Sequence, residues 1–343
     1  MTSDFRAFYF GRAVMVTGGL GFIGSNLARQ LVALGADVLI VDSLIPDYGG
    51  NLFNIAGIEP CVRVNVADVR QESTMNYLVR GRDVIFNLAG QVSHVDSMRD
   101  PYTDLEINCR GQLSLLEACR KYNPGVKVVF AGTRQVYGKP DSLPVSEQHL
   151  VRPTDVNGIN KAAGENYHLL YNNVFGIRAC SLRLTNVYGP RQLVKHDRQG
   201  FIGWFTRLAV EDREIEIYGD GSQLRDFVYV DDVADAFLRA GASDVCNGDV
   251  FNVGGDEPIS HRDLVNLLLG VAGTGRVRFV EWPLDKKRID IGSFYADSRK
   301  FHAAVGWQPR VTLRDGLSAS VDFYREHLAH YLDNAGDMPA GRG

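Results

Sequence analysis

The sequence predicts a doubly wound α/β fold, in which helices cover both faces of a parallel sheet, followed by a smaller C-terminal lobe. Short apolar runs alternate with helical patterns over the first half of the chain. Each run is apolar throughout, as expected of strands that are buried on both faces. After about residue 188 the predicted elements become shorter and turn signals such as Gly219-Asp220-Gly221 become more frequent, which predicts the separate lobe.

Each predicted element follows from its local pattern. The apolar runs that predict strands are Ala13–Thr17, Asp37–Val41, Asp83–Leu88, Lys127–Ala131 and Arg178–Leu184. The segments with apolar residues at helical spacing are Asn26–Leu34, Leu105–Tyr122, Asn157–Val174 and Val233–Gly241. We therefore expect residues 1–188 to form the first domain, with one or two later segments returning to it. Residues 189–330 form the lobe, and the Gly-, Pro- and Ala-rich residues 331–343 form a flexible tail.

Composition excludes several classes of protein. The 343 residues are 45% hydrophobic and carry a net charge of −4, so no nucleic-acid partner is expected. No apolar run approaches the roughly 20 residues of a membrane-spanning helix, and residues 1–11 lack the apolar core of a secretory signal, so no membrane partner is expected. The five cysteines form no Cys-x-x-Cys pair. They favour the reducing cytoplasm and predict neither disulfides nor a metal site.

A glycine-rich segment lies between the first strand and the first helix. It is Thr17-Gly18-Gly19-Leu20-Gly21-Phe22-Ile23-Gly24. Gly18, Gly21 and Gly24 permit a tight turn, close approach of the backbone to a pyrophosphate and close packing of the helix on the strand. The helix N-terminus then faces the phosphates with its unpaired N–H groups.

The end of the second strand indicates which dinucleotide this turn would bind. Asp42 stands there, 24 residues after Gly18. A carboxylate in this place accepts hydrogen bonds from a ribose diol and repels a 2′-phosphate, and neither Ser43 nor Leu44 supplies a cation. We therefore expect a Rossmann-type site for NAD rather than NADP.

Further motifs follow in order along the chain. They are Asp68-Val69, Asn87-Leu88-Ala89-Gly90, Asn108, Thr133 with Val136-Tyr137-Gly138, Asn157 with Lys161–Glu165, Arg183–Arg191, Gly219–Gly221, Arg225–Asp232 and Gly306-Trp307. With the Gly-x-x-Gly-x-x-Gly spacing they resemble the extended short-chain dehydrogenase/reductase family, in its branch of nucleotide-sugar epimerases, dehydratases and decarboxylases. The resemblance covers residues 11–330. It implies NAD as cofactor, with Asp68 and Val69 at the adenine and Leu88, Ala89 and Gly90 as a wall of the site.

The resemblance also implies a catalytic group of Thr or Ser, Tyr and Lys, with the last two spaced Tyr-x-x-x-Lys. A tyrosine hydroxyl, with an ordinary pKa of about 10, needs a nearby ammonium and the cationic nicotinamide to act as a base. Thr133 and Lys161 match the pattern, but Asn157 occupies the tyrosine position. An amide has no acid–base chemistry near pH 7. No other tyrosine lies between Gly138 and Asn166.

Three interpretations of Asn157 remain open. In the first, a residue other than Asn157 is the base. The candidates are Lys161, if burial beside NAD⁺ lowers its pKa, and, more weakly, His94 and Tyr137. Alternatively, the protein binds NAD and a nucleotide sugar without oxidising the sugar. The third is that the tyrosine was replaced deliberately to trap a complex. His94, in the loop after Asp83–Leu88, is also compatible with a structural role in which its ring bonds the backbone.

The residues after Thr133 bear on the reaction. Sugar 4,6-dehydratases of the family have Thr-Asp-Glu here, an acid and a base that eliminate water across C5–C6. This chain has Arg134 and Gln135 instead, which disfavours 4,6-dehydration. Arg134 is then either a partner for an anionic group of the substrate or a solvated cation. The first expectation is epimerisation of a nucleotide-diphosphate sugar through a transient 4-keto intermediate. Decarboxylation of a nucleotide uronic acid, and nucleotide-sugar binding without oxidative activity, are the alternatives.

The remaining expectations concern the substrate and the assembly. Asn186, Arg191, Arg225 and Arg288 match family positions near the nucleotide diphosphate, where a guanidinium fork supplies two parallel charge-assisted hydrogen bonds. Thr133, Arg134 and Gln135 complete the expected substrate site. Nothing in the sequence distinguishes UDP, dTDP, GDP or CDP. The resemblance also implies a homodimer, built by packing the two long helices into a four-helix bundle.

Overall fold

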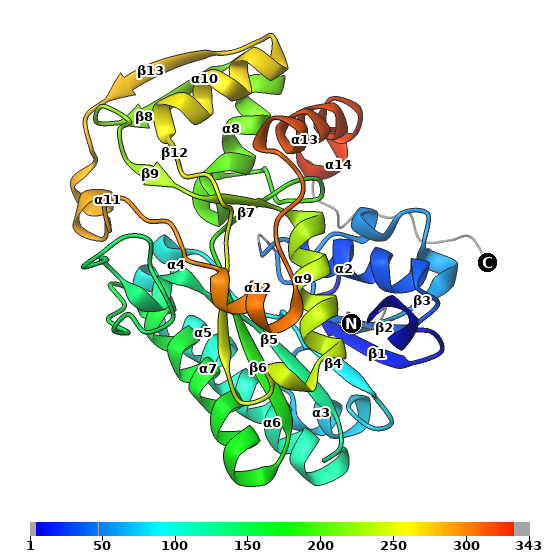
Figure 1. Ribbon diagram of the computed structural model, residues 1–343. Helices are drawn as coiled ribbons and strands as arrows, with labels where there is room; N and C mark the ends of the chain where they lie inside the picture. Colours follow the sequence, from blue (N-terminus) through cyan, green and yellow to red (C-terminus); the bar gives the residue numbers. More distant parts are fainter. Residues whose placement is uncertain (1–4, 47, 333–343) are drawn as a thin grey trace.

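The computed structural model describes residues 5–46 and 48–332, and a seven-stranded sheet in which all strands are parallel forms its centre (Figure 1). The strand order is β11 (Val250–Val253), β6 (Arg178–Leu184), β5 (Lys127–Thr133), β4 (Val84–Asn87), β1 (Ala13–Thr17), β2 (Asp37–Asp42) and β3 (Val62–Val66). The predicted doubly wound parallel fold is confirmed. The sequence reasoning missed β3, because this edge strand alternates Val with Arg and Asn instead of being apolar throughout.

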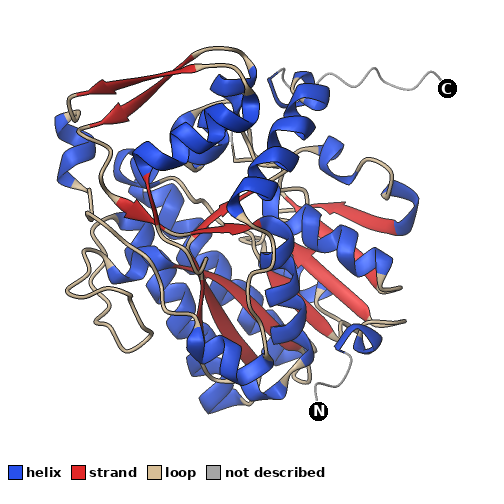
Figure 2. Ribbon diagram, turned by 45° about the horizontal axis from the view of Figure 1, so that its top comes forward, coloured by secondary structure: helices blue, strands red, loops and turns tan. Residues whose placement is uncertain are grey.

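Both faces of the sheet are buried, which explains the apolar runs. In β1, Val14 and Val16 belong to the core cluster on one face, while Met15 belongs to the cluster on the other. The first cluster includes residues of α2 (Phe22–Ala33) and α9 (Val230–Ala242). The second includes residues of α3 (Glu72–Leu78), α6 (Gly111–Tyr122) and α7 (Val156–Phe175). The helices on both sides of the strands are visible in Figure 2.

The chain after residue 188 contributes to both parts of the molecule. Helix α9, strand β11 and helix α12 (Arg299–Val305) contact the large sheet or its helices. A separate core cluster is formed by residues of α8 (Phe201–Val210), β8 (Glu214–Tyr218), α10 (His261–Ala272) and α13 (Leu313–His327). These elements make up the smaller lobe, at the top of Figure 1.

The remaining elements are short. Three two-stranded sheets pair β7 (Asn186–Tyr188) with β10 (Phe227–Tyr229), β9 (Leu224–Arg225) with β12 (Ile259–Ser260), and β8 with β13 (Arg276–Val280). The short helices are α1 (Phe5–Phe8), α4 (His94–Arg99), α5 (Pro101–Leu105), α11 (Leu284–Arg288) and α14 (Ala329–Leu332).

Two predicted segments differ in the structure. The helix predicted over Leu105–Tyr122 is interrupted by a π-helical segment, Glu106–Arg110. Asn108 lies in this segment, and its side chain exchanges two hydrogen bonds with the backbone of Gln91. The prediction of a flexible tail starts too early in the chain, at residue 331. Tyr331 is 4% exposed in α14 and its hydroxyl donates to Asn54 Oδ1 over 2.7 Å, while residues 333–343 lie outside the described residues.

Candidate active site

A cavity of about 1080 Å³ opens where the carboxyl ends of β1, β2, β4, β5 and β6 meet the smaller lobe. In a parallel α/β sheet this is the edge at which ligands bind. The predicted site residues that line it are Gly18, Gly21, Phe22, Ile23, Gly24, Asp42, Asp68, Val69, Leu88, Ala89, Gly90, His94, Thr133, Arg134, Gln135, Asn157, Lys161, Asn186 and Arg225. Segments up to about 200 residues apart in the chain therefore share one cavity.

The glycine turn has the close packing that a dinucleotide site requires. Gly18 has a φ of +66°, and a Cβ there would lie 3.0 Å from the backbone of Leu88 and Ala89. A Cβ on Gly24 would lie 2.2 Å from Gly18 O, so α2 begins directly against the turn. Gly21, Phe22, Ile23 and Gly24 at the start of this helix line the cavity, and the first N–H groups of a helix have no intrahelical partner, so these residues fit a bound pyrophosphate.

Asp42 lies beside this turn, at the end of β2. Its carboxylate accepts hydrogen bonds from the N–H groups of Leu20 and Leu44, each over 3.0 Å. Burial raises the pKa of Asp42 above its ordinary value, although these bonds oppose the shift. Each carboxylate oxygen keeps a lone pair, so Asp42 can still accept from a ribose hydroxyl.

Lys161 lies on the buried side of α7, close to the wall of the cofactor site. Its Nζ donates to the carbonyl of Ala131 over 3.2 Å and stands 5.0 Å from the centre of the Phe130 ring. A Cβ on Gly90 would lie 2.8 Å from the same Nζ. Burial lowers the pKa of Lys161 to about 8. The amine is therefore mainly protonated, and a hydrogen-bond donor, at neutral pH.

Asn157, one turn before Lys161, is a buried amide whose Nδ2 is engaged by neighbouring oxygens. It is 1% exposed, and its Nδ2 donates to Gln91 O over 2.7 Å and to Asp104 Oδ2 over 2.9 Å. Asn160 donates to the other oxygen of Asp104 over 2.8 Å. The two asparagines thus satisfy a buried carboxylate, which explains an amide at this position.

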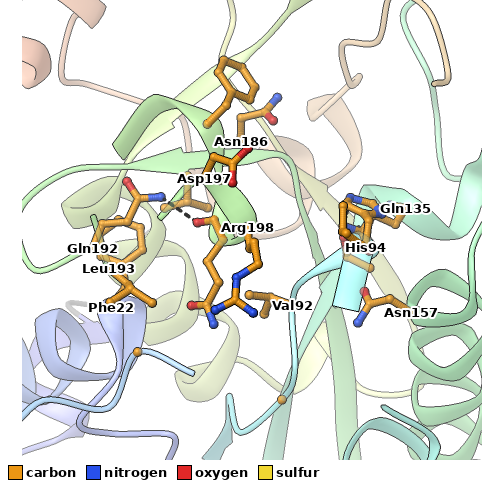
Figure 3. A pocket seen from close by; sticks show the side chains of 18 of the residues that line it. Phe22, Val92, His94, Gln135, Asn157, Asn186, Gln192, Leu193, Asp197 and Arg198 are labelled. Atoms are coloured by element: carbon orange, nitrogen blue, oxygen red, sulfur yellow. Dashed lines mark hydrogen bonds between the residues drawn. The ribbon is translucent and has the colours of Figure 1, made fainter. Parts of the chain in front are cut away.

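Within the described residues, both ring nitrogens of His94 contact side chains and not the backbone beneath its loop. Its Nδ1 lies 2.5 Å from Asp155 Oδ2, and its Nε2 contacts the side-chain amide of Gln135. His94 and Gln135 lie together on one side of the cavity, next to Asn157 (Figure 3). The His94 side chain is 36% exposed, whereas that of Asp155 is 3% exposed. A histidine oriented by a buried carboxylate therefore borders the cavity.

The end of the cavity nearest the small lobe is cationic. Arg225 is buried and donates to the carbonyls of Leu224 and Gly292. Burial, with repulsion from Arg134, lowers the pKa of Arg225 to about 9. His261 also lines this end, and burial lowers its pKa to about 3, so it is neutral. Its Nε2 has no hydrogen-bond partner within the described part of the chain.

The family of the chain follows from its match to the model of the NAD-dependent epimerase/dehydratase family, which spans residues 14–254. The chain belongs to the NAD-dependent epimerase/dehydratase family.

Similar proteins in this family include both epimerases and dehydratases. The UDP-glucose 4-epimerase of Mycolicibacterium smegmatis is 34% identical over 313 residues, which cover 91% of this chain and 98% of that protein. The dTDP-glucose 4,6-dehydratase of Streptomyces griseus is 32% identical over 339 residues, covering 95% and 99%. The structure of the Thermotoga maritima UDP-glucose 4-epimerase with UDP-glucose matches with a TM-score of 0.84 at 31% identity, covering 92% and 99%.

Membership of the NAD-dependent epimerase/dehydratase family establishes NAD as the cofactor. The residues that would hold NAD are the glycine turn, Asp42, Asp68 with Val69, and Lys161, all of which line the cavity. Asp68 also holds Arg70 through a bidentate ion pair with a shortest distance of 2.5 Å. No helix among residues 5–46 and 48–332 is long and apolar enough to cross a membrane.

Three residues expected at this family's site lie outside the cavity. Tyr137 is fully buried, its hydroxyl donates to Asn252 Oδ1 over 2.7 Å, and burial raises its pKa to about 12, so it is not a base for a substrate. Arg191 donates to Asn26 Oδ1 over 2.9 Å and packs on the ring of Phe323.

Arg288, the third, is exposed at the last position of α11. The cavity cation of that segment is instead Lys286, which donates to Tyr218 Oη over 3.0 Å and to Asp197 over 2.9 Å.

Sequence reasoning missed several residues of the site. Asp155, His261 and Lys286 line the cavity, and Asp104 lies behind it. A signal existed for Asp155, because an Asp directly before a predicted helix is a preferred N-cap, and Asp155 does accept from Gly158 N. No local pattern signalled that the same carboxylate would also meet His94, 61 residues away.

Proposed function

We propose that this protein is a nucleotide-sugar epimerase that acts through a transient 4-keto sugar. The observation that carries the proposal is the continuous cavity, which joins the NAD residues to Thr133 and Lys161 at its centre and to Arg225 at its far end. A dinucleotide and a nucleotide sugar can therefore meet with the sugar beside Thr133. The similarity to UDP-glucose 4-epimerases supports this reaction and makes UDP the first nucleotide to test.

Each part of the cavity has a role in this proposal. NAD⁺ supplies a hydride acceptor when it is bound. Thr133, at the end of β5, orients the sugar hydroxyl, and Lys161 donates to the nicotinamide ribose. Arg225 binds the diphosphate, for which a buried guanidinium without a close carboxylate is suited: its nearest ion pair, with Asp290, is 3.9 Å long. Asn157 has no role in proton transfer, because both of its amide protons are engaged by Gln91 and Asp104.

The test is to incubate the protein and NAD⁺ with UDP-glucose, UDP-galactose, UDP-N-acetylglucosamine and UDP-glucuronate, and to follow each sugar by proton NMR. We expect one epimer pair to interconvert from both sides without net consumption of NAD⁺. A protein that binds one of these sugars by calorimetry, yet shows neither conversion nor reduced nicotinamide, would support the binding-protein alternative instead.

Decarboxylation of a nucleotide uronic acid is a second candidate, favoured by Arg134. This residue directly follows Thr133 and lies over the ring of Phe294, and no ion pair of its guanidinium is found among the described residues, although Asp226, Asp155 and Asp290 lie close enough to attract it. Its one side-chain hydrogen bond there is a 3.5 Å contact with Asn186 Oδ1. A guanidinium without a close ion-pair partner suits a sugar carboxylate. Release of carbon dioxide from UDP-glucuronate, lost in Arg134→Gln, would establish this reaction.

We also propose that the protein is a cytoplasmic homodimer. Side chains on α5 and α7 leave apolar surface exposed: Tyr102 is 78% exposed, Ile159 55%, Leu170 48% and Val174 61%. Helix α7 packs against α5 and α6 (Figure 1), so these side chains belong to neighbouring elements. A second copy that packs its α6 and α7 against α6 and α7 of the first would form the expected four-helix bundle, and contact at this face would also cover these side chains. All five cysteines are unpaired, in keeping with a reducing compartment.

A further inference from the structure

The exchange of tyrosine for Asn157 leaves the sugar hydroxyl without an assigned proton acceptor, and the geometry removes two of the three candidates. Tyr137 is buried away from the cavity. Lys161 is buried, its Nζ donates to Ala131 O over 3.2 Å, and the proposed function assigns it to the nicotinamide ribose, so it already has another role. His94 is the candidate that remains.

The partners of His94 select one form of its ring. Asp155 Oδ2 lies 2.5 Å from Nδ1, and a carboxylate can only accept, so Nδ1 carries the proton. In a neutral ring, Nε2 then presents a lone pair. That atom contacts the side-chain amide of Gln135. Asp155 therefore fixes Nε2 as the ring atom available to a substrate hydroxyl, which would take the place of the Gln135 amide.

The position of His94 is also right for this role. The backbone N–H of Gln135 donates to Thr133 Oγ1 over 3.3 Å. Gln135 therefore contacts both His94 and Thr133, the residue expected to orient the sugar. On the other side, Asp155 caps α7 two residues before Asn157, the place where the family has its tyrosine. The same cavity is lined by His94, Thr133, Gln135 and Asp155. Figure 3 shows His94 between Gln135 and Asn157.

We propose that His94, oriented by Asp155, is the general base that replaces the tyrosine. His94 Nε2 takes the proton from the sugar O–H as that C–OH group is oxidised to C=O, and bound NAD⁺ would supply the hydride acceptor. When the hydride returns to that carbon, the imidazolium returns the proton to the oxygen. His94 is the catalytic residue, and Asp155 is a positioning residue. The inference rests on the proposed epimerase function.

The test compares wild type, His94→Gln and Asp155→Asn, with His302→Gln as control because His302 is exposed on α12 outside the cavity. Asparagine remains a good N-cap, so Asp155→Asn keeps the start of α7. Its amide N–H would instead donate to Nδ1 and move the ring proton to Nε2. We expect both variants to convert the UDP-sugar used by wild type at least about 100-fold more slowly, with unchanged calorimetric affinity for UDP.

A second measurement reads the ring itself. Nitrogen-15 NMR of the NAD⁺-bound protein should show His94 protonated at Nδ1 in wild type and at Nε2 in Asp155→Asn, a change that a merely structural role for Asp155 would not produce. Wild-type turnover that persists in His94→Gln would overturn the assignment of the base, as would a wild-type ring protonated at Nε2. If wild type converts none of the four UDP-sugars and forms no reduced nicotinamide, the epimerase function itself fails, and the base with it.

Discussion

At the residue scale, the buried polar groups around α7 explain why an asparagine fits at position 157, where the family has a tyrosine. Asp104 is 1% exposed, and its carboxylate accepts hydrogen bonds from the side-chain amides of Asn157 and Asn160 over 2.9 and 2.8 Å. A buried carboxylate is tolerated only when such donors satisfy it. Asn157 therefore has a structural role in satisfying Asp104, separate from any proton transfer.

We predict that Asn157→Ala lowers the free energy of unfolding by about 1–3 kcal/mol, because one oxygen of Asp104 loses its donor. Asn166→Ala on the exposed side of the same helix should change it by no more than about 0.5 kcal/mol. Urea unfolding of both variants measures the difference. Equal free energies of unfolding in the two variants would mean that the hydrogen bond from Asn157 to Asp104 does not stabilise the fold.

His168, on the same helix, should make the fold sensitive to acid. Its ring is fully buried, stacked 4.4 Å from Phe130, with Nδ1 donating to Gly164 O and Nε2 3.1 Å from Asn87 Nδ2. Burial lowers the pKa of His168 to about 4, against an ordinary 6.5. Between these values the unfolded chain binds the proton and the folded chain does not, so stability falls as the pH drops from about 6.5 to about 4.

We expect His168 to account for up to about 3 kcal/mol of the free energy of unfolding that is lost between about pH 6.5 and pH 4. The measurement is urea unfolding of wild type and His168→Gln at pH 7.5 and pH 5. The stability difference between the two proteins should shrink at the lower pH, because glutamine does not titrate. A constant difference would show that His168 is not held neutral.

At the element scale, the start of α2 decides whether the cofactor turn is intact. Gly24→Ala would place a methyl group 2.2 Å from Gly18 O and 2.8 Å from Gly19 Cα, both backbone atoms that cannot move independently of the turn. We predict that the Kd for NAD⁺ rises at least about tenfold. Gly270→Ala in α10 has no atom within 4 Å of the new methyl group. It should leave the Kd unchanged and raise stability by about 0.5–1 kcal/mol.

Calorimetric titration of NAD⁺ into both variants checks this prediction. An unchanged Kd in Gly24→Ala, with unchanged stability, would contradict the close packing of α2 on the turn. Loss of stability in both variants would instead indicate that helical glycines are required here for reasons other than contact.

At the scale of the whole molecule, the exposed apolar residues of α5 and α7 bear on assembly. Leu170→Glu replaces a 48% exposed side chain by a good helix former, so the fold of one copy should be unaffected. In a four-helix bundle the new carboxylate would be buried without a partner. We predict that light scattering gives a dimer for wild type and a monomer for the variant at micromolar concentration. A wild-type monomer would contradict the proposed assembly.

Local patterns predicted the fold well. The strands Ala13–Thr17 and Arg178–Leu184 have the predicted bounds, since strands buried on both faces must be apolar throughout. Helix α2 begins at Phe22, four residues before its predicted start, because Gly24, assigned to the glycine turn, lies in the first turn of the helix. The missed edge strand β3 carries a mixed pattern, because its side chains are half exposed.

The sequence by itself determined the parallel sheet, the glycine turn, Asp42 at the end of β2 and the absence of tyrosine at position 157. Each of these depends on residues that are close together in the chain. Only the tertiary structure decided which of the distant side chains meet. It placed Tyr137 and Arg191 in packed surroundings, and it brought Asp155 to His94 across 61 residues. Such contacts depend on how helices and loops pack on the sheet, and the local pattern of a sequence does not encode that arrangement.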